Sequence, residues 1–302
     1  MKLGICLPHY GRPLDVERLL DVVDRAEERG LDSVWVTDHV IVPEEMQIIY
    51  RDHMLDPLAV LCWLAGITRR MTLGTSVVIL PYRSPIPVAK LLATADVLSG
   101  GRLIVGAAIG WLEREFDALG VPMRERGARS DEALKLFQAL WTQEVPEVQT
   151  RHYRLHGMKA SPMPVQKPRP PILVGGMSEG AFRRIAQYAD GWMATAASPE
   201  VFRHGQDAVQ RFWKDAGRDG TPLWTLRIPL LIEGVHEPAA DMGLLAGRHM
   251  VQGSVPQVIE ALKRYWALGC SHVALDVAYT SYPAILETID ILVRDVKPAV
   301  AG

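Results

Sequence analysis

The chain has 302 residues, of which 48% are hydrophobic and 23% are charged, proportions that are ordinary for a globular protein. Its 33 basic and 35 acidic residues leave a net charge of −2, which argues against nucleic acid or an anionic membrane surface as a partner. The sequence begins directly with a predicted strand and has no apolar run long enough to span a bilayer, so we expect a cytoplasmic protein.

The predicted elements alternate between apolar strands and helices that have one apolar face. A first strand at residues 3–7 is followed by a helix at 15–29, which Gly30 ends. The same alternation repeats to the end of the chain. Further strands are expected at residues 33–37, 71–80, 103–105, 172–174, 189–195, 224–232 and 273–277, and further helices at 56–67, 84–99, 129–141, from 178, at 199–216, 256–268 and 283–296.

One of these units shows the repeat most clearly. Residues 77–80 and 103–105 are continuous apolar runs, which is the pattern of strands covered on both faces in a parallel sheet. We expect Ser84 to cap the helix between them and Gly100 to help end it. Eight strand–helix units predict a (β/α)8 barrel. A doubly wound open sheet is the alternative, but the Gly-x-Gly-x-x-Gly turn that usually follows its first strand is missing.

Two irregular insertions interrupt the alternation. Residues 142–171 contain six prolines and show no helical period, and residues 233–253 form a second irregular loop. Insertions of this length are uncommon unless they have a function. We therefore expect a single domain over residues 1–302, a barrel that carries both insertions.

In a (β/α)8 barrel the functional residues lie where the strands end. Gly175, Gly176, Met177 and Ser178 end one predicted strand and open a helix, so backbone N–H groups and the helix dipole converge there. Phosphate is the natural occupant of such a turn. A plain tight turn without a ligand explains the same four residues equally well.

Asp38 and His39 follow the second predicted strand and are candidates for an acid/base pair. The commoner alternative is a histidine that the backbone satisfies beneath a loop. A metal site needs several histidine or carboxylate ligands at the strand ends, and beyond His9 and Asp276 the sequence offers few. We expect no metal.

Six motifs follow one another along the chain: VWVTDH from Val34, LGTSVVILPYR from Leu73, LATADVLSGGR from Leu92, GAAIGWLEREFDALG from Gly106, PMPVQKPRPPILVGG from Pro162 and ADGW from Ala189. In this order and spacing the chain resembles the bacterial luciferase-like superfamily of flavin- and deazaflavin-dependent oxidoreductases, which are (β/α)8 barrels with insertions. It is most similar to the branch that depends on coenzyme F420, an 8-hydroxy-5-deazaflavin.

The resemblance implies a role for each matching residue. Asp38 and His39 match a pair beside the redox-active carbon of the cofactor ring, where the histidine is proposed in relatives as acid or base. A cis peptide bond is expected between Ser76 and Val77. The implied cofactor-binding residues are Thr75, Ser76 and Val77 in a bulged third strand beneath the ring, Gly110 under the cofactor tail, and Gly175, Gly176, Met177 and Ser178 at the phosphate.

The resemblance also implies hydride transfer between F420 and a small organic substrate. The alternatives are a two-component monooxygenase that uses FMN in the same barrel, and a flavoprotein without catalytic activity. Tyr10, Trp111 and Tyr279 are expected to shape the substrate site. Trp111 stands where the sugar-phosphate dehydrogenases of the superfamily carry a proton-donating glutamate, so glucose 6-phosphate is not the expected substrate. Dimers are frequent in the family, so a homodimer is also an expectation.

The anionic tail of F420 needs positive charge that FMN does not. The sequence offers candidates between the third strand and the end of the first insertion, although most lysine and arginine side chains are simply solvated at the surface. These candidates are Arg83, Arg151, Arg154, Lys159, Lys167 and Arg169.

Overall fold

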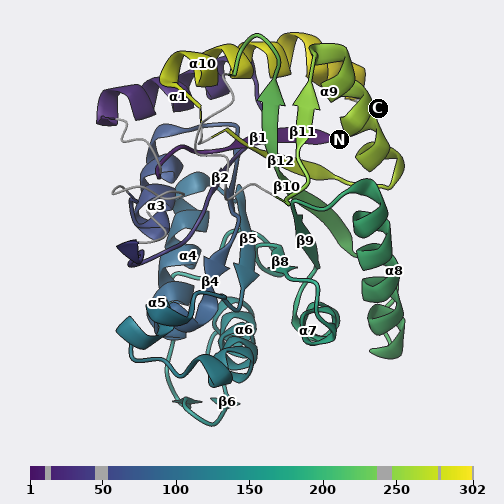
Figure 1. Ribbon diagram of the computed structural model, residues 1–302. Coiled ribbons are helices and arrows are strands. Elements are labelled where there is room, and N and C mark those ends of the chain that lie inside the picture. The colour runs from purple at the N-terminus through teal and green to yellow at the C-terminus, as the bar shows by residue number, and fades with distance from the viewer. Residues whose placement is uncertain (11–14, 45–53, 237–246, 278–279, 301–302) are drawn as a thin grey trace.

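Eight parallel strands form a closed barrel in the computed structural model, which describes residues 1–10, 15–44, 54–236, 247–277 and 280–300 (Figure 1). The strands neighbour one another in chain order, and the last strand, β12, pairs with the first, β1, so that the ring is closed. The predicted (β/α)8 barrel is therefore confirmed. Its strands are β1 (Lys2–Cys6), β2 (Ser33–Val36), β3 (Thr72–Thr75), β5 (Leu103–Ala108), β8 (Ile172–Gly175), β9 (Gly191–Thr195), β10 (Leu223–Ile232) and β12 (His272–Asp276).

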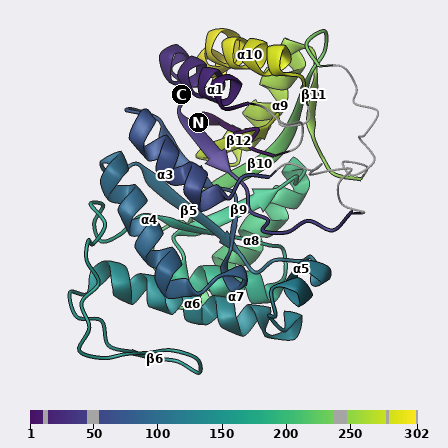
Figure 2. The same ribbon diagram turned by 90° about the vertical axis from the view of Figure 1, so that its left-hand side faces the viewer.

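Helices surround the barrel, as Figures 1 and 2 show from two directions. The long ones are α1 (Val16–Arg29), α3 (Pro57–Ile67), α4 (Pro85–Ser99), α6 (Arg126–Thr142), α7 (Glu179–Tyr188), α8 (Pro199–Asp215), α9 (Val255–Ala267) and α10 (Tyr282–Ile291). Shorter turns of helix are η2 (Leu80–Tyr82), α5 (Glu113–Ala118), η3 (Met123–Glu125), η5 (Leu292–Val296) and α11 (Lys297–Val300). No helix within the described ranges is long and apolar enough to cross a membrane.

The third strand is not continuous, in contrast to the prediction from its unbroken apolar run. It ends at Thr75 and resumes as β4 (Val78–Ile79), and the peptide bond between Ser76 and Val77 is cis, as expected. Leu73 pairs with Leu103, whereas Val78 pairs with Ala107, so the strand gains one residue relative to β5 between these two pairs. This extra residue is a bulge, and it turns Ser76 and Val77 toward the end of the barrel.

The two ends of α4 differ in how well the sequence predicts them. Gly100 ends the helix as expected, with a left-handed backbone (φ 68°) and an N–H that reaches the carbonyls of Asp96 and Val97. Ser84 occupies the N-cap position, but its side chain makes no capping hydrogen bond. Pro85 begins the helix instead, because its fixed φ suits the first turn and its missing N–H leaves no donor to satisfy.

The first insertion contains a short hairpin that was not predicted. Strands β6 (Val148–Gln149) and β7 (Arg154–Leu155) pair antiparallel and project from the barrel (Figure 2). In the second insertion, β11 (Val251–Gly253) pairs in parallel with the last three residues of β10. Both insertions therefore have some regular structure within the residues described.

A small cluster built around Trp35 fills the interior of the barrel. A side chain at Gly74 on the neighbouring strand would place its Cβ 2.0 Å from the Trp35 ring, so glycine is required there for the indole to fit. Residues from opposite sides of the barrel complete this cluster, which lies beneath the carboxyl ends of the strands. The cluster consists of Cys6, Trp35, Leu173, Met193 and Ala274.

A buried histidine ties the segment after β10 to α10 and gives the fold a pH dependence. His236 accepts the Ile232 N–H at Nδ1 (2.9 Å), and its Nε2 lies 2.7 Å from Thr288 Oγ1. Burial lowers the pKa of His236 to about 4. The unfolded chain, in which histidine titrates near ~6.5, binds the proton more readily, so stability should be complete above that pH and fall between it and about 4.

We expect His236→Gln to lose this part of the pH dependence. The measurement is the free energy of unfolding from urea titrations at pH 7 and pH 5, compared between wild type and variant. If both proteins lose the same amount of stability on acidification, His236 is not the titrating group.

Candidate active site

A cavity of about 500 Å³ opens at the carboxyl ends of the strands, and we call it the strand-end cavity. Loops that follow β2, β3, β5, β8 and β9 supply its walls, which is the usual position of an active site in this fold. Its lining residues are Thr37, Asp38, His39, Ser76, Val77, Ile79, Ala108, Ile109, Gly110, Trp111, Gly175, Gly176, Thr195, Ala196, Arg227, Gly247 and Arg248.

His39 forms a hydrogen-bonded pair with Glu115, a residue that sequence reasoning did not single out. His39 Nδ1 lies 2.7 Å from Glu115 Oε2, and the carboxylate is fully buried. Burial alone would raise the pKa of Glu115, but the hydrogen bonds from His39 and from the Val40 N–H outweigh it, and the pKa is lowered. The ring of Trp111 stands edge-on to His39, with 6.3 Å between the ring centroids.

Asp38 makes a different pair from the one the sequence suggested. Its carboxylate accepts two hydrogen bonds from Arg83, at 2.7 and 3.0 Å, and one from the Ile79 N–H at 2.9 Å. Burial raises the pKa of the Asp38 carboxyl, and these three donors oppose that shift. Asp38 thus anchors β4 and Arg83, whereas Glu115 is the carboxylate that His39 contacts.

Arg227, also missed by sequence reasoning, lines the cavity and connects five strand ends there. Its guanidinium donates to Asp276 at 2.6 Å, to the Tyr10 hydroxyl at 2.8 Å, and to both Thr37 Oγ1 and the Ser76 carbonyl at 2.9 Å. The Tyr10 hydroxyl in turn donates to Asp276 at 2.9 Å. The network fixes the Ser76 carbonyl and thereby the bulge.

The glycine turn after β8 reaches the cavity, but not with all four predicted residues. Gly175 and Gly176 line the cavity, and Gly176 has a φ of 118°, which side chains rarely adopt. Ser178 is the N-cap of α7 and accepts the Ala181 N–H. Met177 is 46% exposed and, like Ser178, is not among the described lining residues.

The remaining predicted residues are divided between the cavity and the layer below it. Gly110 and the half-exposed Trp111 line the cavity, as do Ser76 and Val77. Thr75 is buried below, where its hydroxyl donates to the Gly106 carbonyl. Tyr10 is fully buried in the Arg227 network, so the structure does not place it at the cavity wall. Tyr279 lies outside the described residues.

The predicted cationic rim is not assembled at the cavity. Arg169 pairs with Asp190, which immediately precedes β9, so it lies at the amino ends of the strands, opposite the cavity. Lys159 pairs with Glu144, and Arg151 lies near Glu125, all on other parts of the surface. Of the six candidates, Arg83 alone contacts a lining residue in the described structure, and Asp38 and Asp56 neutralise it. Arg248 lines the cavity instead.

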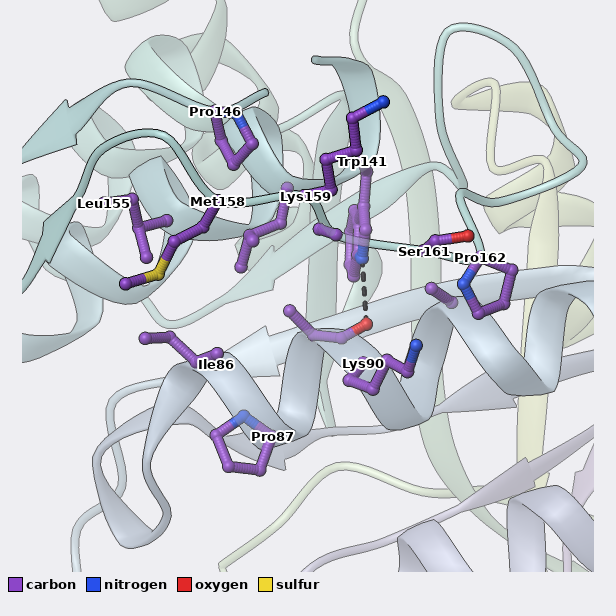
Figure 3. Close-up of a pocket in the computed structure, with 14 residues that line it drawn as sticks. Ile86, Pro87, Lys90, Trp141, Pro146, Leu155, Met158, Lys159, Ser161 and Pro162 are labelled. Carbon is purple, nitrogen blue, oxygen red and sulfur yellow. Dashed lines mark hydrogen bonds between the residues drawn. The ribbon is translucent and has the colours of Figure 1, made fainter. Parts of the chain in front are cut away.

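A second cavity of about 320 Å³ lies on the outer side of the barrel, between α4, α6 and the first insertion (Figure 3). Its wall is mainly apolar, and the Trp141 indole N–H is satisfied by the Ala89 carbonyl at 3.0 Å. Lys90 and Lys159 are the charged residues among those that line it. It shares no lining residue with the strand-end cavity and contains neither an acid/base pair nor a glycine turn.

The sequence of the chain matches a known family. A sequence profile described as luciferase-like monooxygenase covers residues 1–242. The chain belongs to this family. An uncharacterised protein of Mycobacterium tuberculosis is 34% identical over 210 residues, which are 65% of this chain and 74% of that protein. An F420-dependent glucose-6-phosphate dehydrogenase of Amycolatopsis mediterranei is 30% identical over 244 residues, 74% of this chain and 67% of that enzyme.

Two solved structures share the fold over the whole chain. The monooxygenase RslO1 from Streptomyces bottropensis superposes with a TM-score of 0.85 at 22% identity, covering 100% of both chains. An F420-dependent secondary alcohol dehydrogenase, solved with an F420–acetone adduct, has a TM-score of 0.83 at 19% identity and covers 100% of this chain and 99% of its own. At these identities the likeness establishes the fold.

Replacing Gly176 with alanine should weaken cofactor binding at least tenfold, or ~1.4 kcal/mol. The new Cβ would lie 2.9 Å from the Ala181 Cβ at a φ that disfavours side chains, so the turn must shift away from the cavity. For the same reason we expect the unfolding temperature to fall. Fluorescence titrations with F420 and FMN, well below the unfolding temperature, measure the affinity.

Gly180→Ala is the matched control, because a Cβ at Gly180 in the same turn region meets nothing closer than Ser178 Oγ at 3.8 Å. It should leave affinity unchanged. If Gly176→Ala binds both cofactors as tightly as wild type, the glycine turn has only a structural role.

Proposed function

We propose that this protein is an oxidoreductase that transfers a hydride between coenzyme F420 and a small organic substrate. The observation that carries the proposal is the composition of the strand-end cavity, where the His39–Glu115 pair, the Ser76–Val77 bulge and the Gly175–Gly176 turn meet. Family membership supports redox chemistry, and F420-dependent enzymes are among the relatives in sequence and in structure.

The residues present fit a bound deazaflavin. A cavity of about 500 Å³ lies within the range of cofactor sites. Gly110 and Gly176, whose positive φ values favour glycine, leave its wall without a side chain at these two positions. A Cβ at Gly110 would lie 2.8 Å from Ile79 Cγ2. We infer that Ser76 and Val77 support the ring, that Gly110 leaves room for the tail, and that the N–H groups at Gly175–Gly176 face the phosphate.

When bound, the deazaflavin supplies a ring carbon that accepts or gives up a hydride, and the protein orients the reactants and manages the proton. His39 lines the cavity and is the residue positioned to take or give that proton. Trp111, half-exposed beside His39, presents an apolar wall to the substrate. A tryptophan side chain cannot act as the general acid that a glutamate provides at this position, and its apolar surface favours an apolar organic substrate over a sugar phosphate.

A two-component monooxygenase that uses FMN is the second candidate. Two observations favour it: the likeness to the monooxygenase RslO1, and the likeness to the oxygenating component of 3,6-diketocamphane monooxygenase from Pseudomonas putida, solved with FMN, at a TM-score of 0.77 and 15% identity. The neutralised Arg83 and the remote Arg169 also remove the cationic rim that would have favoured F420.

The test is a titration of the purified protein with F420 and with FMN, at low and at raised salt, followed by visible absorption. Tight binding of F420 that weakens with salt is the expected result, because its tail is polyanionic and Arg248 lines the cavity. Preferential binding of FMN, with oxygen consumed in the presence of substrate, would replace the first proposal with the second.

A further inference from the structure

We propose that the second cavity, on the outer side of the barrel, is a binding site for a small carboxylate with an apolar body. We call it the outer cavity. It lies between α4, α6 and the first insertion, and it shares no lining residue with the strand-end cavity (Figure 3). A ligand bound there is therefore independent of the proposed function.

The floor of the outer cavity is apolar and buried. It is formed by Leu140 and Trp141 of α6 and by Ala89 and Ala93 of α4, whose exposed fractions are 7% or less. The N–H group of the Trp141 ring already donates to the Ala89 carbonyl at 3.0 Å, as Figure 3 shows. An ordered water needs about two to four polar partners, which these side chains do not offer. An apolar group is therefore the better occupant of the floor.

The wall that the first insertion contributes is held in place before a ligand binds. Pro146 and Pro162 line the cavity, and the ring of each proline fixes its backbone φ. Asp96, a buried residue of α4, accepts the N–H groups of Val165 and Gln166 at 2.8 and 3.1 Å and so ties the insertion to the helix. A preformed cavity of about 320 Å³ lies within the range of small-molecule sites and loses little entropy on binding.

The mouth of the outer cavity carries positive charge. Lys90 is exposed there and makes no ion pair with any residue that the structure describes. In Figure 3 its ammonium group lies on the same side of the cavity as Ser161, whose hydroxyl is a further donor. Lys159 pairs with the exposed Glu144 at 2.6 Å. No carboxylate is among the described lining residues, so an anionic head group would meet complementary charge at Lys90.

The floor and the mouth together define the class of ligand. A hydrocarbon body gains free energy by leaving water for the apolar floor, and a carboxylate gains a charge-assisted hydrogen bond from Lys90 at the mouth. The ligand is therefore a monocarboxylate with a body of about the size of a phenylalkyl group. 4-Phenylbutyrate is a probe with both features, and 4-phenylbutyramide is its uncharged match.

The first readout is the ¹³C NMR spectrum of the full chain labelled at its methionine methyl groups. Met158 lines the outer cavity, whereas Met177 follows the glycine turn at the strand-end cavity. The Met158 signal, assigned by its loss in Met158→Leu, should shift and saturate as 4-phenylbutyrate is added, and the Met177 signal should stay in place. An unchanged Met158 signal at ~10 mM probe would overturn the proposal, because a built site should bind more tightly than that.

Lys90→Met tests the charge, because it keeps the length of the side chain and removes the ammonium group. It should weaken binding of 4-phenylbutyrate by ~3- to 5-fold, the usual size of an exposed charge pair, and leave the affinity for 4-phenylbutyramide unchanged. Lys135→Met, at an exposed lysine of α6 that is not among the described lining residues, is the matched control and should behave like wild type. If Lys90→Met weakens both probes equally, or neither, the assignment of a carboxylate is wrong.

Ala93→Leu tests the floor, because Ala93 is 2% exposed and its longer replacement would occupy the space that the probe needs. The Met158 signal of this variant should no longer respond to 4-phenylbutyrate. Wild-type affinity in a folded Ala93→Leu variant would place the probe elsewhere and overturn the proposal. If the variant does not fold, the comparison of the two probes in Lys90→Met decides. A Met158 signal that shifts with protein concentration alone, and not with the probe, would mean that a second copy of the chain fills the cavity, which also overturns the proposal.

Discussion

His39→Ala is expected to lower turnover by ~10²-fold or more while cofactor affinity changes little, because the variant loses its acid/base group but keeps the bulge and the glycine turn. The prediction follows from the position of His39 at the wall of the strand-end cavity, hydrogen-bonded to the buried Glu115. Steady-state kcat and the dissociation constant of the cofactor, measured on the same preparation, separate the two effects.

His204→Ala provides the control for this experiment, because His204 is an exposed histidine on α8, away from the cavity lining. It should behave like wild type. A full rate in His39→Ala would return His39 to the commoner role of a buried, satisfied histidine at the end of a strand.

Asp276→Ala should cost ~3–5 kcal/mol of the free energy of unfolding, because it leaves the Arg227 guanidinium in a buried site without its counter-charge. The side chains of the pair are 16% and 3% exposed, and their closest atoms are 2.6 Å apart. Loss of Asp276 also removes the hydrogen bond that the Tyr10 hydroxyl donates to it. Guanidinium chloride unfolding, followed by circular dichroism, measures the change.

The chain offers a matched comparison for that measurement. Arg294 and Asp295 lie at the same distance of 2.6 Å, but their side chains are 68% and 33% exposed. Solvent screens such a pair, so Asp295→Ala should change stability far less than Asp276→Ala. Equal losses in the two variants would mean that the Arg227 network does not hold the strand ends together.

The alternation of buried strands and amphipathic helices was sufficient to predict the barrel, because both patterns depend on local residue spacing. The bulge between Thr75 and Val78 did not follow from that pattern, since the residues around it are as apolar as those of a regular strand. It was expected only from the family resemblance.

The carboxylates and cations of the site were harder to predict because their partners are distant in sequence. Nothing local distinguishes Glu115 from Glu113, yet one is fully buried against His39 and the other is exposed. Arg227 did carry a usable signal, because a charged residue inside an apolar strand requires a partner of opposite charge. The cationic rim failed for the converse reason, since residues gathered in one insertion need not face the cavity.

The most direct test of the proposed function is an anaerobic assay of the protein with oxidised F420 and a panel of small, reduced organic compounds, in which loss of the visible absorption of the oxidised deazaflavin reports hydride transfer. We predict that this absorption decreases with at least one compound, at a rate that depends on His39 and not on oxygen. If F420 stays oxidised with every compound, and FMN supports oxygen-dependent turnover of an organic substrate instead, the central claim is contradicted.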